Sequence, residues 1–278
     1  MESKNRGERL TLFIILLVVS LFMIYPMIWM LFNSVKPTAE VLNGSMKLWT
    51  DNPQWENYTN ALKLAPFFKF LGNSLFTSVM IVACQLFLSA LLAYALTQLE
   101  FKGRQTIFMI ILCTYMLPSA ATYVPSYVLL SKLHLMNTLT GIIVSNLANA
   151  FMVFLLRQSF LKIPQEIIEA ARADGASEWR ILWRVVVPMA RNTLLNAAII
   201  SFISNFNSYL WPSLITNDQN KYLISVGLNK FSSSQGAFGE TFPLIMAATV
   251  IAVFPLIIVY FVLQKYFIGA VQSSSVKG

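Results

Sequence analysis

The sequence predicts an all-α integral membrane protein: six transmembrane helices in a single domain over residues 1–278, with cytoplasmic N- and C-termini. Three observations lead to this fold class. The chain is 56% hydrophobic and only 12% charged, whereas soluble domains carry about 25% charged residues. Several uncharged runs reach the roughly 20 residues with which a helix crosses a bilayer. Backbone N–H and C=O groups cannot stay unpaired in lipid, so these runs are expected to be helices.

Six apolar runs are expected to span the membrane. In order they are Thr11–Phe32, Asn73–Leu96, Thr106–Leu129, Leu139–Leu156, Thr193–Trp211 and Pro243–Leu263. The first run is longer than the apolar part of a signal peptide and no small-residue cleavage site follows it, so we interpret it as a retained anchor. Pro118 and Pro125 interrupt the third run, which is expected to kink or to end early, with the residues after Pro118 at the outer mouth.

The distribution of Lys and Arg predicts the orientation. With the N-terminus inside, thirteen of the 20 Lys and Arg residues lie on the cytoplasmic side and the remaining seven lie outside. This excess follows the positive-inside rule. The net charge of +8 is therefore explained by membrane topology, and a nucleic-acid partner is not expected, because no basic stripe lies on a soluble face.

The sequence contains no pattern typical of an enzyme or a metal site. Cys84 and Cys113 both fall inside predicted spans, where a cysteine usually acts as a small apolar residue. His134, the only histidine, is predicted in an external loop. We therefore expect no catalytic residues, no metal and no cofactor bound by this chain.

A polar insert separates the fourth span from the fifth. It covers about 161–190, and ten of the 35 residues from 157 to 191 are charged. Pro164 suits the first position of a helix. Glu166 and Glu169 would lie near the positive N-terminal end of that helix, where carboxylates are favoured.

The second half of the insert predicts a turn and a second helix. Gly175, preceded by Asp174, is placed to end the first helix in a left-handed cap. Ser177 can cap a helix that continues through Val185. Pro188 then marks the bend into the fifth span. The insert is therefore expected to form a cytoplasmic helix–turn–helix.

Small side chains give the first helix of the insert a narrow flank. Ala170, Ala171 and Ala173 would let its backbone lie deep in a groove of a partner, and Ile167 and Ile168 would supply apolar contact area. The alternative is an ordinary pair of surface helices that closes a long loop.

The insert resembles the EAA loop of ABC import permeases, which docks onto an ATPase subunit. The resemblance rests on Glu169-Ala170-Ala171, Gly175 six residues after the Glu, and Pro188 thirteen residues after the Gly. Further matches are Tyr25-Pro26, Ser34-Val35-Lys36-Pro37, Asn57-Tyr58, Asn73-Ser74, Ala93-Tyr94-Ala95, Phe101-Lys102-Gly103-Arg104, Phe154-Leu155-Leu156-Arg157-Gln158, Asn207-x-x-Leu210-Trp211-Pro212 and the terminal Val276-Lys277-Gly278. Nearly the whole chain is thus similar to the shorter, six-span permease of maltose-type carbohydrate importers.

Two positions depart from the family pattern. Val185-Val186-Val187-Pro188 stands where Ile-x-Leu-Pro is common, and Ser273–Ser275 stand where Gly-rich residues usually precede the terminal Val-Lys-Gly. The first change is conservative. The second puts any role of the tail in doubt.

The resemblance implies a multi-subunit importer in the lipid of a bacterial plasma (inner) membrane. Its parts would be a heterodimer of this chain with a second permease, two ATPase subunits that bind the ATP, and an extracytoplasmic sugar-binding protein. The implied ATPase-coupling residues are Glu169, Ala170, Ala171, Asp174, Gly175 and Pro188. This chain itself would not be an enzyme.

Polar and aromatic residues of the fifth span form a candidate substrate path. They are Ser204, Asn205, Asn207, Ser208, Tyr209 and Trp211. Uncharged hydrogen-bonding groups beside aromatic faces suit a neutral oligosaccharide. The alternative is structural, because Ser and Asn often join membrane helices and Trp often marks the interface.

Two other substrate and mechanism classes stay open. A glycerol-phosphate or other polyol importer belongs to the same family, but a phosphate would favour an Arg or Lys partner, and none lies between Thr193 and Trp211. A stand-alone secondary transporter would need intramembrane carboxylates or paired broken helices of its own, and neither is evident.

Overall fold

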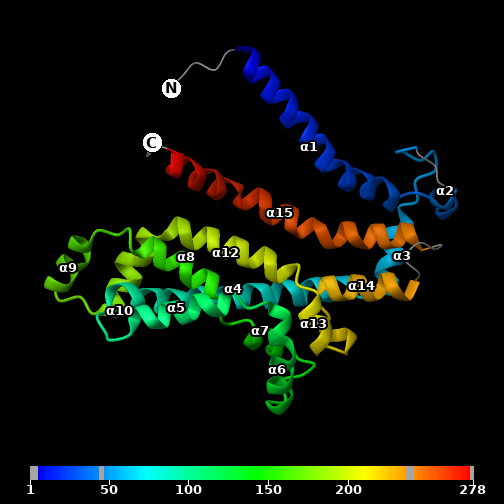
Figure 1. Ribbon diagram of the computed structural model, residues 1–278. Helices are drawn as coiled ribbons and strands as arrows, with labels where there is room; N and C mark the ends of the chain where they lie inside the picture. The colour runs from blue at the N-terminus through cyan, green and yellow to red at the C-terminus, as the bar shows by residue number, and fades with distance from the viewer. Residues whose placement is uncertain (1–5, 44–46, 236–240, 276–278) are drawn as a thin grey trace. The chain divides into compact units, whose positions relative to one another are not determined.

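The computed structural model describes residues 6–43, 47–235 and 241–275, and every regular element in these ranges is a helix (Figure 1). The expectation of an all-helical fold is therefore confirmed for the described residues. The chain divides into two compact units, Met1–Phe68 with Gly227–Pro255 and Lys69–Val226 with Leu256–Gly278. Each unit joins segments that are distant in the sequence. The single domain stays a prediction.

The first unit contains three helices before the start of α4. They are α1 (Arg6–Ser34), α2 (Thr38–Leu42) and α3 (Glu56–Leu64). Asn57 of α3 is buried and donates hydrogen bonds to the carbonyls of Ser34 at 3.0 Å and Lys36 at 3.2 Å. The last carbonyls of a helix lack partners within it, so Asn57 fixes α3 to the end of α1.

The second unit contains most of the helices. They are α4 (Phe67–Gln98), α5 (Arg104–Tyr115), α6 (Ser119–Lys132), α7 (Leu139–Ser145), α8 (Ala150–Phe160), α9 (Gln165–Ala173), α10 (Glu178–Ile181), the π-helix η1 (Leu182–Val186), α11 (Val187–Met189), α12 (Arg191–Phe206), α13 (Leu210–Ile215) and the 3-10 helix η2 (Gln219–Lys221). Two more helices, α14 (Ile224–Gln235) and α15 (Phe242–Ser275), have residues in both units, as does α4, whose first two residues lie in the first unit. Helix α8 packs against α5 and α12 (Figure 1).

The described helices account for up to six spans by length and composition. Three are long and apolar enough alone: Gly7–Ser34, Phe67–Gln98 and Phe242–Phe261. Three further candidates are bent pairs: α5 with α6 at 99°, α7 with α8 at 49°, and Glu178–Met189 with α12 at 80°. The number six depends on counting each pair as one span, so it stays a prediction.

The third span breaks where the sequence indicates. Helix α5 ends at Tyr115, and α6 begins at Ser119 with Pro118 as its N-cap. Pro118 has no N–H to donate and fixes its own φ, so the helix cannot run through it undisturbed. Pro125 behaves differently from the prediction, because it lies inside α6 without ending it.

The fourth span, expected over Leu139–Leu156, is a bent pair of helices. The helix stops at Ser145 and resumes at Ala150. The Asn146 side chain donates to the carbonyl of Ile142 at 2.8 Å, while the Asn149 side chain accepts from the N–H of Met152 at 3.0 Å and caps α8. Asn side chains compete with the helical backbone for hydrogen bonds in this way, which explains the break.

The fifth span also ends earlier than predicted. Helix α12 stops at Phe206 rather than at Trp211, and a separate short helix, α13, begins at Leu210. The Asn207 side chain donates back to the carbonyl of Ile203 at 2.9 Å. This local bond offers the backbone an alternative to another helical turn.

Candidate coupling segment and substrate path

The polar insert forms two helical arms joined by a tight turn. Its first arm is α9, and Pro164 is the N-cap residue just outside it rather than the first helical residue. Glu166 lies in the first turn of α9. There its carboxylate is favoured by the positive end of the helix. We call residues 161–190 the coupling segment.

Gly175 ends α9 in the predicted left-handed conformation, with φ of +79°. The N–H of Ala176 donates to the carbonyl of Ala171, and the N–H of Gly175 donates to the carbonyl of Arg172, both at 3.0 Å. These are the two bonds of a Schellman motif. A left-handed residue here costs least when it is glycine.

The second arm is less regular than predicted. Ser177 caps α10 as expected, its hydroxyl accepting from the N–H of Arg180. The helix then widens into η1 before Pro188, which lies in α11. A proline ring in a regular helix would collide with the carbonyl four residues earlier, here that of Arg184, and a π-helical turn relieves this collision. The expected bend into α12 follows directly, at 80°.

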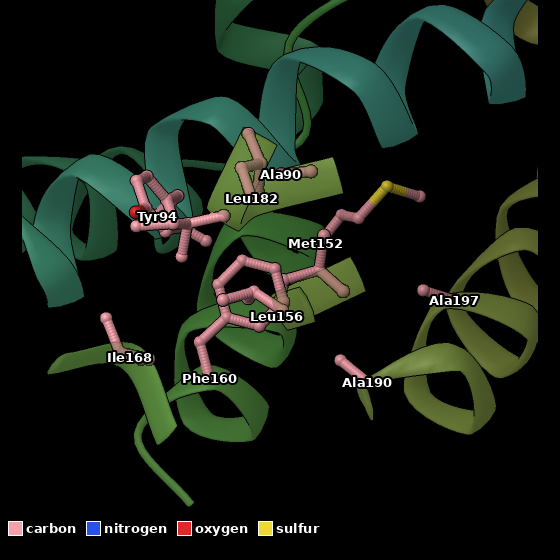
Figure 2. Packing of buried hydrophobic residues seen from close by; sticks show 12 residues of the cluster. Ala90, Tyr94, Met152, Leu156, Phe160, Ile168, Leu182, Ala190 and Ala197 are labelled. Atoms are coloured by element: carbon pink, nitrogen blue, oxygen red, sulfur yellow. The ribbon is translucent and has the colours of Figure 1, made fainter. Parts of the chain in front are cut away.

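Apolar side chains fix the coupling segment to the membrane helices. Figure 2 shows Ile168 of α9 and Leu182 of η1 in one buried cluster with Tyr94 of α4 and with Leu156 and Phe160 of α8. Ile168 is fully buried there. It was predicted to offer contact area to a partner, and this was wrong, because the protein's own core occupies that face.

A polar clamp made by Tyr94, Gln98, Arg172 and Glu178 adds a second attachment. Arg172 Nε donates to Glu178 Oε1 at 2.8 Å, and Arg172 Nη2 donates to the carbonyl of Gln98 at 2.9 Å. The Tyr94 hydroxyl donates to Glu178 Oε2. The hydrogen bond from the Arg172 guanidinium lowers the pKa of the Glu178 carboxyl. The clamp therefore ties both arms of the segment to the end of α4.

The opposite face of α9 is exposed. Glu169, Ala170 and Asp174 are exposed, as is Ile167, while Ala171 is half-buried against the core. Pro188 is exposed on the second arm. Helix α9 therefore has an inward face that packs against the rest of the chain and an outward face that is exposed.

The candidate path residues do not share one environment. Ser204, Asn207 and Tyr209 are exposed, and Asn205 and Ser208 are half-buried. Asn205 Nδ2 donates to the carbonyl of Ser201 at 2.8 Å and to its hydroxyl at 3.1 Å.

Trp211 differs from the other path candidates because it is buried. Its Nε1 donates to Ser145 Oγ at 2.8 Å, and its ring stacks on Tyr123 with centroids 5.3 Å apart. Buried tryptophans commonly find such a hydrogen-bond partner. In this conformation Trp211 joins α13 to α6 and α7 and presents no ring to a substrate.

Gln85 is a buried polar residue that the sequence analysis missed. Its Nε2 donates to the carbonyl of Asn146 at 2.6 Å, in the break between α7 and α8. Its Oε1 accepts from Ser201 Oγ at 2.6 Å and from Asn149 Nδ2 at 3.1 Å. One side chain of α4 therefore joins the broken fourth span to α12. A lone Gln inside a long apolar run was the available signal.

Comparison with known proteins supplies the family. Residues 85–272 match the model of the family described as binding-protein-dependent transport system inner membrane component. The chain belongs to this family. As a transport-system membrane component, it resembles the diacetylchitobiose uptake system permease protein NgcG of Streptomyces coelicolor, with 34% identity over 94% of this chain and 86% of the relative.

Two other relatives extend the likeness to almost the full length. The arabinooligosaccharides transport system permease protein AraQ of Bacillus subtilis is 29% identical over 97% of this chain and 96% of its own. A crystal structure of a bacterial ABC transporter that imports the acidic polysaccharide alginate contains a chain with TM-score 0.84 and 28% identity, covering 96% of this chain and all of that one. The fold of this transport-system component is therefore that of an ABC importer permease.

Proposed function

We propose that this chain is the permease subunit of an ABC importer for a neutral oligosaccharide. It forms the translocation path with a second permease, receives the sugar from an extracytoplasmic binding protein, and is driven by two ATPase subunits that bind the ATP. The assembly lies in the bacterial plasma membrane, with both termini of this chain and the coupling segment in the cytoplasm. Family membership and the sugars in the names of relatives support this proposal.

The coupling segment transmits movement because it is attached on one side and open on the other. Glu169 and Ala170 face outward from α9, whereas Ile168 and the polar clamp fix the same helix to α4 and α8. Protein interiors are close-packed and deform little. A displacement of α9 by an ATPase is therefore passed to the membrane helices. This one-sided attachment is the observation that carries the coupling role.

The energy required is modest. A shift of a two-state permease from 1:99 to 99:1 takes about 5.5 kcal/mol of differential binding. An ATPase that binds the outward face of α9 more tightly in one state of the permease than in the other supplies this difference in binding free energy. The coupling residues in this scheme are Glu169, Ala170, Ala171, Asp174, Gly175 and Pro188.

The substrate proposal rests on the absence of charge in the fifth span. No Lys, Arg, Asp or Glu lies between Thr193 and Trp211. Ser204, Asn207 and Tyr209 are exposed on this stretch and can meet the hydroxyls and C–H faces of a sugar. Asn205 and Ser208 support them, and Trp211 holds the outer end of the path in shape. A glycerol phosphate would instead favour an Arg or Lys beside its phosphate in this stretch.

A pull-down with one bulky substitution tests the coupling role. Ala170→Trp widens the outward face of α9 and is expected to abolish co-purification of the ATPase with the permease. Ala121→Trp, at an exposed position of α6, is the matched control and is expected to leave co-purification unchanged. If Ala170→Trp also leaves it unchanged, the docking proposal is wrong. A stand-alone secondary transporter would bring down neither an ATPase nor a second permease.

A further inference from the structure

An apolar groove lies beside the second arm of the coupling segment. It has a volume of about 500 Å³, and α4 and α12 form its two sides. Its apolar lining includes Ala83 and Phe87 of α4, Trp183 of η1 and Leu194 of α12, and the only charged side chain in it is Arg191. Ligand cavities commonly have volumes of 300–1,000 Å³, so the groove is large enough for part of a lipid chain.

A polar pocket adjoins the groove and shares Trp183 with it. This pocket has a volume of about 480 Å³ and is lined by Ser177, Trp179, Arg180, Trp183 and Arg184. Trp183 stacks on Phe87 at 5.6 Å between ring centroids and meets Trp179 edge-on at 5.7 Å. An apolar groove and a cationic pocket therefore meet at one group of aromatic rings.

Three arginines lie around this site. Within the part of the chain that the structure describes, Arg180, Arg184 and Arg191 form no ion pair with any carboxylate. The nearest acidic residue in the sequence, Glu178, is held by Arg172 in the polar clamp. The site thus combines apolar surface with free positive charge.

We propose that this site binds an anionic phospholipid of the cytoplasmic leaflet, with an acyl chain in the groove and the phosphate at the arginines. Arginine pairs with phosphate through two parallel N–H···O bonds. Basic pockets between membrane helices on the cytoplasmic side bind acidic headgroups, and tryptophans mark the membrane interface. The proposal rests on the orientation given under Proposed function, because only then does the site face the anionic inner leaflet.

Native mass spectrometry of the assembled complex tests the site. The complex, in mild detergent, is titrated with phosphatidylglycerol or with phosphatidylcholine of the same acyl chains. The wild type is expected to retain phosphatidylglycerol preferentially. The double variant Arg184→Gln, Arg191→Gln is expected to weaken that retention about thirtyfold, since each basic residue near a lipid surface contributes on the order of 1 kcal/mol. Ala83→Phe, which fills the groove without changing charge, is also expected to weaken it.

Arg104→Gln is the matched control. Arg104 is an exposed cation on the same predicted side, beside a pocket formed with Glu100, Phe101 and Lys102 that has no apolar groove. Its replacement is expected to leave retention unchanged. Equal retention of both lipids, equal weakening by Arg104→Gln, or no lipid in the complex because the second permease covers the groove would each overturn the proposal. The wild-type spectra also separate the two proposals. Absence of an ATPase subunit from the wild-type complex would count against the coupling role, whereas lipid retention is judged from the lipid-bound species alone.

Discussion

Gly175→Val changes the turn of the coupling segment without creating a collision. A Cβ added at Gly175 would meet no atom within 4 Å, so the cost comes only from the backbone φ of +79°. An L-residue held in this left-handed region costs roughly 1–2 kcal/mol, and a β-branched side chain lies at the upper end. The two Schellman hydrogen bonds oppose a change of conformation, at about 1 kcal/mol each. The cost of the left-handed backbone is therefore similar to the free energy with which the two hydrogen bonds hold the turn. We expect the turn to open in a large fraction of molecules.

Gly103→Val is the matched control for this experiment. Gly103 also has positive φ, +87°, and a Cβ there would likewise meet nothing within 4 Å. It caps α5, far along the sequence from the coupling segment. Both variants are expected to lose similar stability, but only Gly175→Val is expected to lose coupling.

The assay compares three quantities in the two variants. They are the amount of folded permease in the membrane, co-purification of the ATPase, and uptake of the transported sugar. We expect Gly175→Val to lower uptake several-fold for the same amount of folded permease, while Gly103→Val retains uptake in proportion to its abundance. Equal uptake defects in the two variants would show that general backbone strain, and not the coupling turn, is being measured.

Two further predictions concern the membrane helices. Gln85→Leu removes three hydrogen bonds, which in membrane proteins average about 0.6 kcal/mol each. The free energy of unfolding, measured in mixed detergent micelles, should therefore fall by about 2 kcal/mol. Ser201→Ala removes one of these bonds and also the bond that Ser201 Oγ accepts from Asn205, so it should lower the free energy of unfolding by about 1.2 kcal/mol at about 0.6 kcal/mol for each bond. Adding it to Gln85→Leu should cost only about 0.6 kcal/mol more, for the Asn205 bond; full additivity would mean that the two side chains are not coupled. Asn207→Leu should reduce sugar uptake without reducing ATPase co-purification, and unchanged uptake would remove Asn207 from the path.

Local signals in the sequence predicted the local structure well. Gly175, Ser177 and Pro118 act within a few residues of themselves, through φ, a side-chain cap and a missing N–H, and each behaves as expected. The same is true of the coupling segment as a helix–turn–helix. The exposed face of α9 also contains Glu169 and Ala170, as the docking hypothesis requires.

Features that depend on contacts between distant residues could not be predicted in this way. The polar clamp joins Tyr94 to Glu178, 84 positions apart, and Gln85 reaches Ser201 across 116 positions. The burial of Ile168 likewise depends on helices that the insert itself does not contain. The break at Asn146 had a local cause, but an Asn in an apolar run is compatible with a continuous helix until its partners are known.

The bond from Gln85 to position 146 has a consequence for anyone who compares homologous chains. Its acceptor is a main-chain oxygen, which every amino acid carries, so the bond itself makes no demand on the chemistry of the side chain at position 146, which acts only through the helix break that leaves this oxygen available. Correlated substitutions between the two columns of an alignment are therefore not expected. This contact between neighbouring helices is visible in the structure but would not be detected from covariation between sequences.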